Sequence, residues 1–258
     1  MKENISKAAD LISRSRHLVA LTGAGISTAS GIPDFRSPGS GLWTRINPFL
    51  VASIHGFRLR PKSFYRWLRP LAAKMRVADP NVAHVALARL EEMGLLKVLI
   101  TQNVDGLHQA AGSRRVLELH GDARRMTCTK CGKSFPSESF IKDYLDAGTI
   151  PRCPDCRAVM KPSVVLFGEL YPVRPLLEAV AQSDSSDVML VVGSSLQIAP
   201  ACELPERARE SGAEIIVVNL EPTPADSFAS VVIREDVTNA LPRIVEAVVE
   251  RQSKSRAQ

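Results

Sequence analysis

Aromatic residues are scarce in this sequence: Phe, Trp and Tyr make up 5% of its 258 residues, whereas hydrophobic residues of all kinds make up 45%. We therefore expect a packed core built mainly from aliphatic side chains, and no long disordered region. The chain also lacks any run of about 18 apolar residues, which excludes a transmembrane helix. Its N-terminus is polar and has no apolar stretch typical of a targeting signal. These features predict a soluble, cytoplasmic protein without membrane contact.

Acidic residues are absent from residues 58–76, which hold seven Lys or Arg and the aromatic residues Phe64, Tyr65 and Trp67. The whole chain has a net charge of +6, which favours acidic partners or nucleic acid but says nothing about the fold. The stretch is typical of a solvated helix face with a few apolar anchors, and we favour that interpretation over a nucleic-acid-binding stripe. A weak contact with nucleic acid or an acidic partner is the alternative.

Short apolar, β-branched runs alternate with helical patterns along much of the chain. Helices are expected at 5–15, 175–182, 203–211 and 239–251. Strands are expected at 17–22, 98–101, 116–119, 164–167, 188–192, 215–218 and 231–233. Strands that are apolar on both faces and separated by helices predict an α/β fold, with a parallel sheet that helices cover on both sides.

Two stretches interrupt this alternation. Residues 38–93 hold no clear strand and are expected to form a loop and helices, while residues 122–162 are polar and contain four of the five cysteines. We interpret both as insertions that form a second, smaller domain, with a helical part and a cysteine-rich module. The main domain is then built from residues 1–37, 94–121 and 163–258.

The four cysteines of the second insertion stand in two pairs, Cys128-x2-Cys131 and Cys153-x2-Cys156, with 21 residues between the pairs. Each pair lets two thiolates converge on one ion, and four thiolates complete a closed tetrahedron with no open position for catalysis. Disulfides are disfavoured in a reducing compartment, so we predict one structural Zn²⁺, with disulfide or redox chemistry as weaker alternatives. Cys202 has no partner and is expected to be a buried small side chain.

A glycine-containing corner, Gly23-Ala24-Gly25, directly follows the first expected strand. Such glycines let backbone N–H groups approach a pyrophosphate closely. However, Thr28 stands where the dinucleotide fingerprint has its third glycine, and no acidic residue follows about twenty positions later. Taken alone, the corner is equally compatible with an ordinary turn. Two more strands end in small or polar residues, Gly193-Ser194-Ser195 and Asn219. Because ligands bind at the carboxyl ends of parallel strands, these three ends predict one crevice.

A single polar residue at a strand end, such as His120, is ordinarily a satisfied core or surface residue, but here many polar strings follow one another. In order they are GAGIS at 23–27, GIPDFR at 31–36, TQNVDGLH at 101–108, ELHG at 118–121, the paired CxxC motifs, VVLFGE at 164–169, GSSL at 193–196 and VNL at 218–220. Together they strongly resemble the sirtuins, the NAD-dependent protein deacylases. The resemblance covers essentially the whole chain, and it implies that the main domain is a Rossmann-like NAD-binding domain.

The resemblance also implies a reaction. Departure of nicotinamide from NAD leaves an electrophilic ribose carbon, which the acyl-lysine oxygen attacks. A histidine then acts as base for a ribose hydroxyl, and water completes the release of free lysine and O-acetyl-ADP-ribose. His120 matches the family's base, and an imidazole, whose ordinary pKa is about 6.5, suits that role.

Further roles are implied position by position. Asn103 matches the residue that positions a water beside the nicotinamide ribose, and Asp105 matches the one that holds the carboxamide. The implied NAD-binding set comprises Gly23, Ala24, Gly25, Ser27, Asp34, Phe35, Arg36, Gln102, Asn103, Val104, Asp105, Gly193, Ser194, Ser195, Asn219, Leu220, Asp236 and Val237. An acetylated protein segment is expected to bind as an extended strand by β-augmentation. Its implied contacts are Val165, Phe167, Gly168 and Glu169 on one side and Gln197 and Ile198 on the other.

The acyl group is expected to be uncharged. Sirtuins that remove succinyl or malonyl groups carry a Tyr and an Arg three residues apart, whereas Tyr65 is followed at that distance by Leu68. The leading hypothesis is an NAD-dependent protein-lysine deacetylase that is most similar to broadly acting prokaryotic sirtuins. Two alternatives stay open: mono-ADP-ribosyl transfer, and a zinc-containing nucleic-acid-binding protein that keeps NAD as a sensor.

Overall fold

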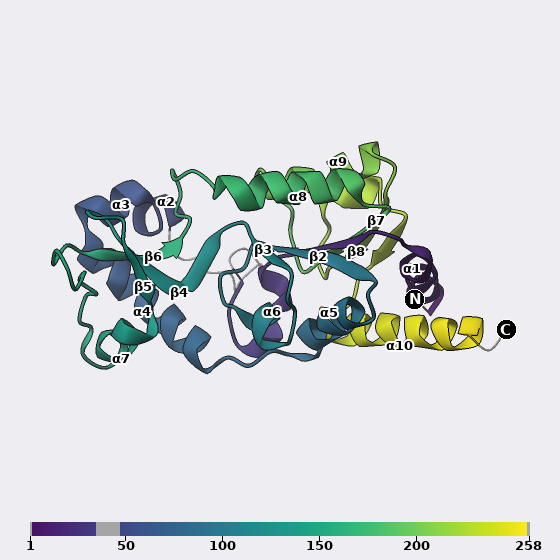
Figure 1. Ribbon diagram of the computed structural model, residues 1–258, viewed down its shortest axis with the longest axis horizontal. Coiled ribbons are helices and arrows are strands. Elements are labelled where there is room, and N and C mark those ends of the chain that lie inside the picture. The colour runs from purple at the N-terminus through teal and green to yellow at the C-terminus, as the bar shows by residue number, and fades with distance from the viewer. Residues whose placement is uncertain (1, 35–46, 257–258) are drawn as a thin grey trace.

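The computed structural model describes residues 2–34 and 47–256, and its main sheet has six parallel strands in the order β3–β2–β1–β7–β8–β9 (Figure 1). The strands are β1 (Leu18–Thr22), β2 (Leu96–Thr101), β3 (Val116–Glu118), β7 (Val188–Val192), β8 (Glu214–Val218) and β9 (Val231–Ile233). The strand order runs outward in both directions from β1. This is the doubly wound Rossmann arrangement, in which a ligand crevice forms outside the carboxyl ends of the two central strands. The predicted fold class is confirmed.

Helices cover both faces of this sheet. On one face lie α1 (Lys2–Arg14), α5 (Val82–Glu92) and α10 (Val237–Arg256), and on the other α8 (Val173–Ser185) and α9 (Leu204–Glu210). Figure 1 shows α8 and α9 above the sheet and α5 and α10 below it. Both interfaces are aliphatic, as expected: Ile12, Leu90 and Leu241 are fully buried on the first face and Val217 on the second.

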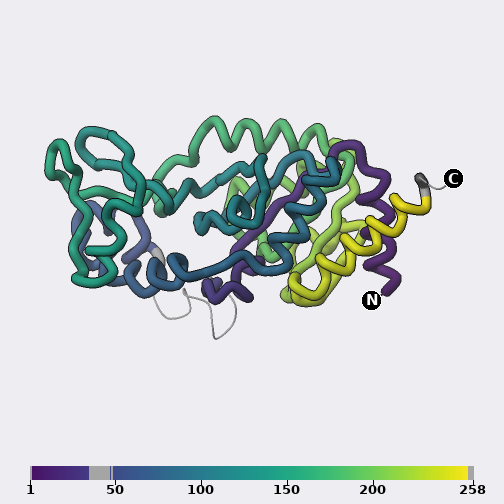
Figure 2. Tube along the Cα trace, turned by 60° about the horizontal axis from the view of Figure 1, so that its bottom comes forward, coloured from purple at the N-terminus to yellow at the C-terminus, as the bar shows by residue number. Residues whose placement is uncertain are grey.

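A second, antiparallel sheet in the order β5–β4–β6 lies at one end of the molecule (Figures 1 and 2). Its strands are β4 (Gly121–Cys128), β5 (Ser134–Pro136) and β6 (Met160–Val164), and the helices beside it are α2 (Pro48–Val51), α3 (Ile54–Leu59), α4 (Pro61–Val77) and α7 (Glu138–Ala147). This small domain holds an aromatic cluster, in which the Phe57 and Phe64 rings meet edge to face at 5.0 Å and the Tyr65 and Tyr144 rings at 5.2 Å. The few aromatic residues are therefore concentrated where the aliphatic core does not reach.

Three sequence expectations need revision. Residues 164–167 are not a strand of the main sheet: Val164 ends β6, which pairs with β4 in the small sheet, and the following residues lie outside the strands. Cys202 is half-buried rather than buried. The expected helical part at 38–93 includes α5, which packs against α10 and β2 of the main domain. We therefore propose that the helical part of the small domain ends near residue 77.

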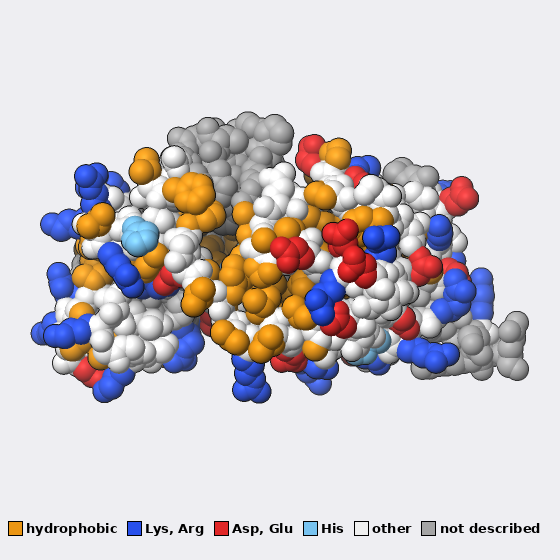
Figure 3. All heavy atoms as spheres, turned by 90° about the horizontal axis from the view of Figure 1, so that it is seen from above, with side chains coloured by type: hydrophobic (Ala, Val, Ile, Leu, Met, Phe, Trp, Pro, Cys, Tyr) orange, Lys and Arg blue, Asp and Glu red, His pale blue; other side chains and the backbone are white. Residues whose placement is uncertain are grey.

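The surface composition differs along the molecule. Figure 3 shows Lys and Arg side chains on the small-domain end, and hydrophobic side chains gathered near the middle of the face on which α8 lies. Around the start of α8, Leu170, Val173 and Leu177 are 92%, 66% and 64% exposed. Within the described parts of the chain, no helix combines the length and the apolar character needed to cross a membrane.

Candidate active site

A cavity of about 1510 Å³ opens at the carboxyl ends of the central strands of the main sheet and extends to the small domain. Single-ligand pockets usually measure about 300–1,000 Å³, so this cavity has room for more than one substrate. Its walls include all the described residues of the catalytic, NAD-binding and peptide-binding sets predicted from the sequence. Phe35 and Arg36, which belong to the predicted NAD-binding set, lie outside the described residues.

The glycine corner after β1 packs tightly against the loop after β7. Gly25 N–H donates to Gly193 O at 2.8 Å, and Gly23 N–H donates to Val192 O at 3.1 Å. A Cβ atom on Gly23 or Gly25 would lie within 2.9 Å of the backbone of Gly193 or Ser194. Both N–H groups are thus used within the protein, so these glycines permit the close approach of two loops and do not themselves present N–H groups to a phosphate.

Ser27, Asn103 and Asp105 form one hydrogen-bonded unit at the nicotinamide end predicted for the cavity. Asn103 Nδ2 donates to Ser27 Oγ at 3.0 Å and to Gly23 O at 3.2 Å, while Ser27 Oγ donates to Asp105 Oδ2 at 2.7 Å. Leu107 N–H donates to the other carboxylate oxygen of Asp105 at 3.0 Å. Because a carbonyl can only accept, the Gly23 contact identifies the Asn103 amide nitrogen, which leaves Asn103 Oδ1 with acceptor capacity for a ligand.

A buried layer of polar side chains supports the unit formed by Ser27, Asn103 and Asp105. His108 Nε2 lies 2.9 Å from Thr22 Oγ1, which donates to Thr101 Oγ1 at 2.8 Å, and Thr101 in turn accepts from Asn103 N–H at 3.0 Å. Burial lowers the pKa of His108 to about 3, with a further contribution from the adjacent His84. The ring is therefore neutral at physiological pH, and its proton lies on Nε2, since Thr22 donates elsewhere. The layer fixes the backbone of Asn103 without adding charge.

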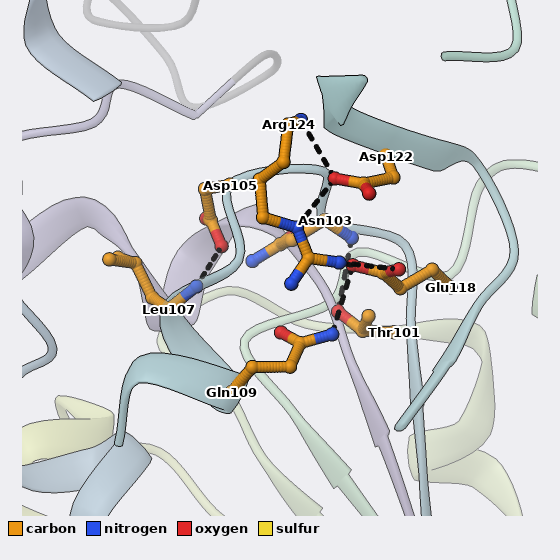
Figure 4. A network of polar contacts seen from close by, with 8 residues as sticks. All are labelled: Thr101, Asn103, Asp105, Leu107, Gln109, Glu118, Asp122 and Arg124. Carbon is orange, nitrogen blue, oxygen red and sulfur yellow. Dashed lines mark hydrogen bonds and ion pairs between the residues drawn. The ribbon is translucent and has the colours of Figure 1, made fainter. Parts of the chain in front are cut away.

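Arg124, on β4, joins the two domains beside the loop that carries Asn103 and Asp105 (Figure 4). Its Nη2 lies 2.9 Å from both carboxylate oxygens of Glu118 on β3, and its Nε lies 2.6 Å from Asp122 Oδ1. Burial raises the pKa of Glu118, and the Arg124 charge opposes that rise. The aliphatic part of Arg124 rests against Gly106, where an added Cβ would lie 3.0 Å from Arg124 Cδ. The loop that carries Asp105 is thus held from the small-domain side.

His120 lies just beyond the end of β3, on the cavity wall. Its Nδ1 is 2.7 Å from Gln102 O, so Nδ1 carries a proton and donates it to this carbonyl. A neutral His120 ring then keeps its lone pair on Nε2, which lies 3.1 Å from the Tyr171 hydroxyl. Gln102 also donates from Nε2 to Ser194 Oγ at 2.8 Å, which links the ends of β2 and β7.

The first predicted peptide-binding segment follows β6. Val165 N–H donates to His120 O at 2.8 Å. Phe167 makes two main-chain hydrogen bonds near the start of α3: its N–H donates to Ala52 O, and its carbonyl oxygen accepts from Ile54 N–H, both at 3.0 Å. Glu169 Oε2 accepts from Leu166 N–H at 2.9 Å and thereby closes the turn. The Glu169 carboxylate therefore shapes the segment.

The second predicted peptide-binding segment follows the loop after β7. Gln197 is exposed and Ile198 is half-buried, and both line the same cavity as the residues of the first segment. Ile198 O accepts from Cys202 N–H at 3.0 Å, and Ala199 O accepts from the Tyr171 hydroxyl at 2.9 Å. Side chains from two distant parts of the chain thus bound one groove.

The four paired cysteines converge at the far end of the small sheet. All four sulfur atoms lie within 4.8 Å of one another, with Cys128 Sγ 3.4 Å from Cys156 Sγ and Cys131 Sγ 3.7 Å from Cys153 Sγ. Bonds of about 2.3 Å to one Zn²⁺ would place tetrahedral sulfurs about 3.8 Å apart, whereas a disulfide needs about 2.05 Å. Backbone N–H groups, first that of Cys131, lower the pKa of Cys128 to about 6. The cluster fits one structural zinc ion.

Comparison with known proteins identifies the family. The sequence pattern of the Sir2 family matches residues 23–200. The chain belongs to the Sir2 family. It is 47% identical over 249 residues to NAD-dependent protein deacylase 2 of Archaeoglobus fulgidus, covering 96% of this chain and 97% of the relative. It is 46% identical over 243 residues to the NAD-dependent protein deacetylase of Sulfolobus acidocaldarius, covering 94% of each.

A solved Sir2 structure with a deacetylated p53 peptide and 3'-O-acetyl ADP ribose has the same fold. It superposes with a TM-score of 0.89 at 42% identity and covers 94% of this chain and 97% of its own. The resemblance inferred from the ordered sequence strings is confirmed.

The adenosine end predicted for this Sir2 chain is built from residues that also cap local structure. Asn219 Nδ2 donates to Glu221 O at 2.7 Å, and Asp236 Oδ1 accepts from Thr238 N–H at 2.8 Å at the start of α10. Both residues, which follow β8 and β9, line the same cavity as Gly25.

Several polar residues at or beside the site were not predicted from the sequence, among them Tyr171. Tyr171 contacts His120 although 51 positions separate them. Its neighbours Leu170 and Pro172 carry no pattern that points to a site, so only the path of the chain from β6 to α8 could reveal the contact. The buried His108 and Thr22 were likewise outside the predicted set, although His108 stands inside the string TQNVDGLH.

Proposed function

We propose that the chain is an NAD-dependent protein-lysine deacetylase, which removes acetyl or another uncharged acyl group and produces nicotinamide, O-acetyl-ADP-ribose and free lysine. The observation that carries the proposal is the position of the His120 imidazole on the wall of one cavity. That cavity is also lined by the Asn103–Asp105 unit and by both predicted peptide-binding segments. The names of the two relatives, and the peptide and acetyl ADP ribose held by the solved Sir2 protein, support the same reaction.

His120 is proposed as the general base. NAD, when bound, supplies an electrophilic ribose carbon and the hydroxyl groups that accept the acyl group. The hydrogen bond from Nδ1–H to Gln102 O selects the tautomer in which Nε2 is basic. Nε2 can then take a proton from a ribose hydroxyl, and the Gln102 carbonyl favours the imidazolium that results.

Asn103 and Asp105 are proposed to hold the nicotinamide end. Asn103 Oδ1 accepts a hydrogen bond from a water or a ribose hydroxyl, because both protons of its amide are directed to protein acceptors. Asp105, held by Ser27 and by the N–H of Leu107, receives the carboxamide together with the backbone of Val104. A rigid polar pocket of this kind orients the ligand at little entropic expense.

The peptide is proposed to bind as a strand between the segments around Val165 and Ile198. Among the described residues, Val165 O and both main-chain groups of Gly168 have no backbone partner, so they are available for pairing. We propose an uncharged acyl group because the polar atoms of Tyr65 and Arg69 are already engaged within the protein. The Tyr65 hydroxyl donates to Met160 O at 2.6 Å, and Arg69 is engaged with the carbonyl oxygens at the end of α7.

The remaining proposals concern the role of the zinc ion, the cellular location of the enzyme and the basic stretch at residues 58–76. Four thiolates leave no ligand position for substrate, so zinc serves the fold. We place the enzyme in the cytoplasm, in accord with its reduced cysteines. In residues 58–76, Phe64 and Tyr65 are 2% exposed and cannot stack on bases. A contact of this stretch with nucleic acid or an acidic protein would be ionic, weak and sensitive to salt.

The test is turnover of an acetyl-lysine peptide. The protein is incubated with NAD and the peptide, and peptide mass and nicotinamide release are followed together. We expect nicotinamide release to require the peptide and to yield free lysine in equal amount. The His120→Ala variant should lose deacetylation and still bind NAD.

Each alternative gives a different result. Transfer of label from NAD onto protein, without loss of acetyl from the peptide, would favour mono-ADP-ribosyl transfer. Absence of turnover together with DNA binding that weakens between low and physiological salt would favour the nucleic-acid-binding alternative. An active His120→Ala variant would contradict the role of the base.

A further inference from the structure

Tyr171 lies where the base and the second peptide-binding segment meet. Its hydroxyl is 3.1 Å from His120 Nε2 and 2.9 Å from Ala199 O, and the Tyr171 and His120 rings lie 5.4 Å apart at 48°. It lines the cavity and is half-buried, and burial raises the pKa of its hydroxyl, which therefore stays protonated. The residue is thus a neutral group with one proton and two neighbouring acceptors.

Counting protons shows what this hydroxyl can do. Because Nδ1 of His120 donates to Gln102 O, Nε2 of the neutral ring can only accept, and Ala199 O can only accept. The single Tyr171 proton can therefore satisfy either Nε2 or Ala199 O, but not both. When Nε2 is protonated, the conflict ends: Nε2–H donates to the Tyr171 oxygen while the Tyr171 proton goes to Ala199 O. With a protonated Nε2, the Tyr171 hydroxyl therefore both donates, to Ala199 O, and accepts, from His120.

The position of Tyr171 is set by elements outside the small domain. Pro172, the next residue, precedes α8, whose first turn begins with Leu176 N–H donating to Pro172 O at 3.1 Å. The main-domain helix α8 therefore orients the tyrosine, and the link to Ala199 ties it to the loop after β7. The contact with His120 is made between parts of one rigid main domain.

We propose that Tyr171 is a positioning residue for His120. Its O–H donates to Ala199 O, so its oxygen faces His120 as an acceptor. When Nε2 takes a proton from the ribose hydroxyl, the Tyr171 oxygen accepts a hydrogen bond from Nε2–H and stabilises the imidazolium. The proposal rests on the proposed deacetylase function. It concerns only the step in which a base removes a proton from the ribose hydroxyl. Cleavage of the nicotinamide–ribose bond needs no base.

The test compares the wild type with Tyr171→Phe, which keeps the ring and removes the hydroxyl. Two rates are measured with saturating NAD and acetyl-lysine peptide: deacetylation, and exchange of labelled nicotinamide into NAD. We expect kcat for deacetylation to fall about three- to tenfold, the usual effect of one lost hydrogen bond, while exchange and the KM values change less than about twofold. Leu170→Ala, which truncates an exposed neighbour, is the matched control and should leave both rates unchanged.

The outcomes separate the two proposals. If the wild type does not deacetylate the peptide, the proposed function fails. If the wild type is active and Tyr171→Phe deacetylates at the same rate, the positioning role is overturned. It is also overturned if exchange and deacetylation fall together in Tyr171→Phe, because that result indicates a distorted cleft. A selective loss of deacetylation, with an unchanged melting temperature, supports it.

Discussion

Replacing Gly25 by Ala should weaken NAD binding through the packing of two loops. The added Cβ would lie 2.8 Å from Gly193 O and 2.9 Å from Gly193 Cα, and both neighbours are backbone atoms that cannot rotate away. Ordinary van der Waals contact begins near 3.4 Å, so the loops after β1 and β7 must separate by roughly half an ångström. Overpacking of this kind destabilises proteins by about 1–3 kcal/mol.

The same displacement should reach the ligand, because both loops line the predicted NAD site. We expect NAD affinity to fall roughly tenfold, which corresponds to about 1.4 kcal/mol of binding free energy. We expect the melting temperature to fall by roughly 2–12 °C. Calorimetric titration with NAD and a thermal unfolding scan measure the two effects separately.

Gly212→Ala provides the matched control. Gly212 has a φ angle of +98°, a conformation that is strained for alanine, but an added Cβ there would meet nothing within 4 Å. The control should therefore lose stability by about 1–3 kcal/mol through backbone strain alone, with NAD affinity unchanged. Wild-type NAD affinity in Gly25→Ala, or an equal loss of affinity in both variants, would refute the reasoning.

Two further predictions concern the small domain. Cys153→Ala removes one of four thiolates from the cluster, so we expect loss of bound zinc by atomic absorption, rapid hydrogen exchange across residues 122–162 and loss of activity. The control Cys202→Ala should keep its zinc, its slow exchange and its activity. A zinc-free but fully active Cys153→Ala would contradict a structural role. Arg124→Gln breaks partly exposed ion pairs, so we expect less than about 1 kcal/mol of lost stability but a several-fold higher KM for NAD, because Gly106 loses its support. An unchanged KM for NAD in steady-state assays would show that Arg124 does not support the loop that carries Asp105.

Much of the main sheet could be predicted because its strands are continuous apolar runs. The run at 188–192 is completely buried and coincides with β7, and the run at 231–233 coincides with β9. The run at 164–167 was misassigned for a physical reason. Only Val164 of this run lies in a strand, where it pairs with Gly121 of β4, and the residues of β6 before it include Lys161 and Pro162, which hide the strand pattern.

The candidate site was predictable only where residues stand next to one another in recognisable strings. Asn103 and Asp105 share one string with their local partners Thr101 and Leu107, so this proximity follows from the sequence, whereas their contacts with Ser27 do not. For Gly23 and Gly25 the sequence could not show that the backbone filling the space beside them comes from Gly193, in the loop after β7 and more than 160 positions away. Long-range packing of this kind has no local sequence pattern.

The zinc cluster and the base are connected through one pair of strands. At one end of the β4–β6 pair, Cys128 lies opposite Met160, and at the other end Gly121 lies opposite Val164. Directly beyond that end, Val165 N–H donates to His120 O at 2.8 Å. Gly121 has a φ angle of +80°, and an added Cβ would lie 2.1 Å from Ser163 O, so the strands meet at van der Waals contact where the base begins.

We therefore predict that a zinc ion at one end of this short antiparallel pair helps to fix the main-chain position of His120 at the other end. Loss of zinc should free the Cys128 end first, and we expect the disturbance to reach His120 through the β4–β6 pair, whose residues Met126, Pro162 and Val164 also line the cavity. Such a link would let a closed, four-thiolate site affect catalysis although its ion has no ligand position to offer the substrate.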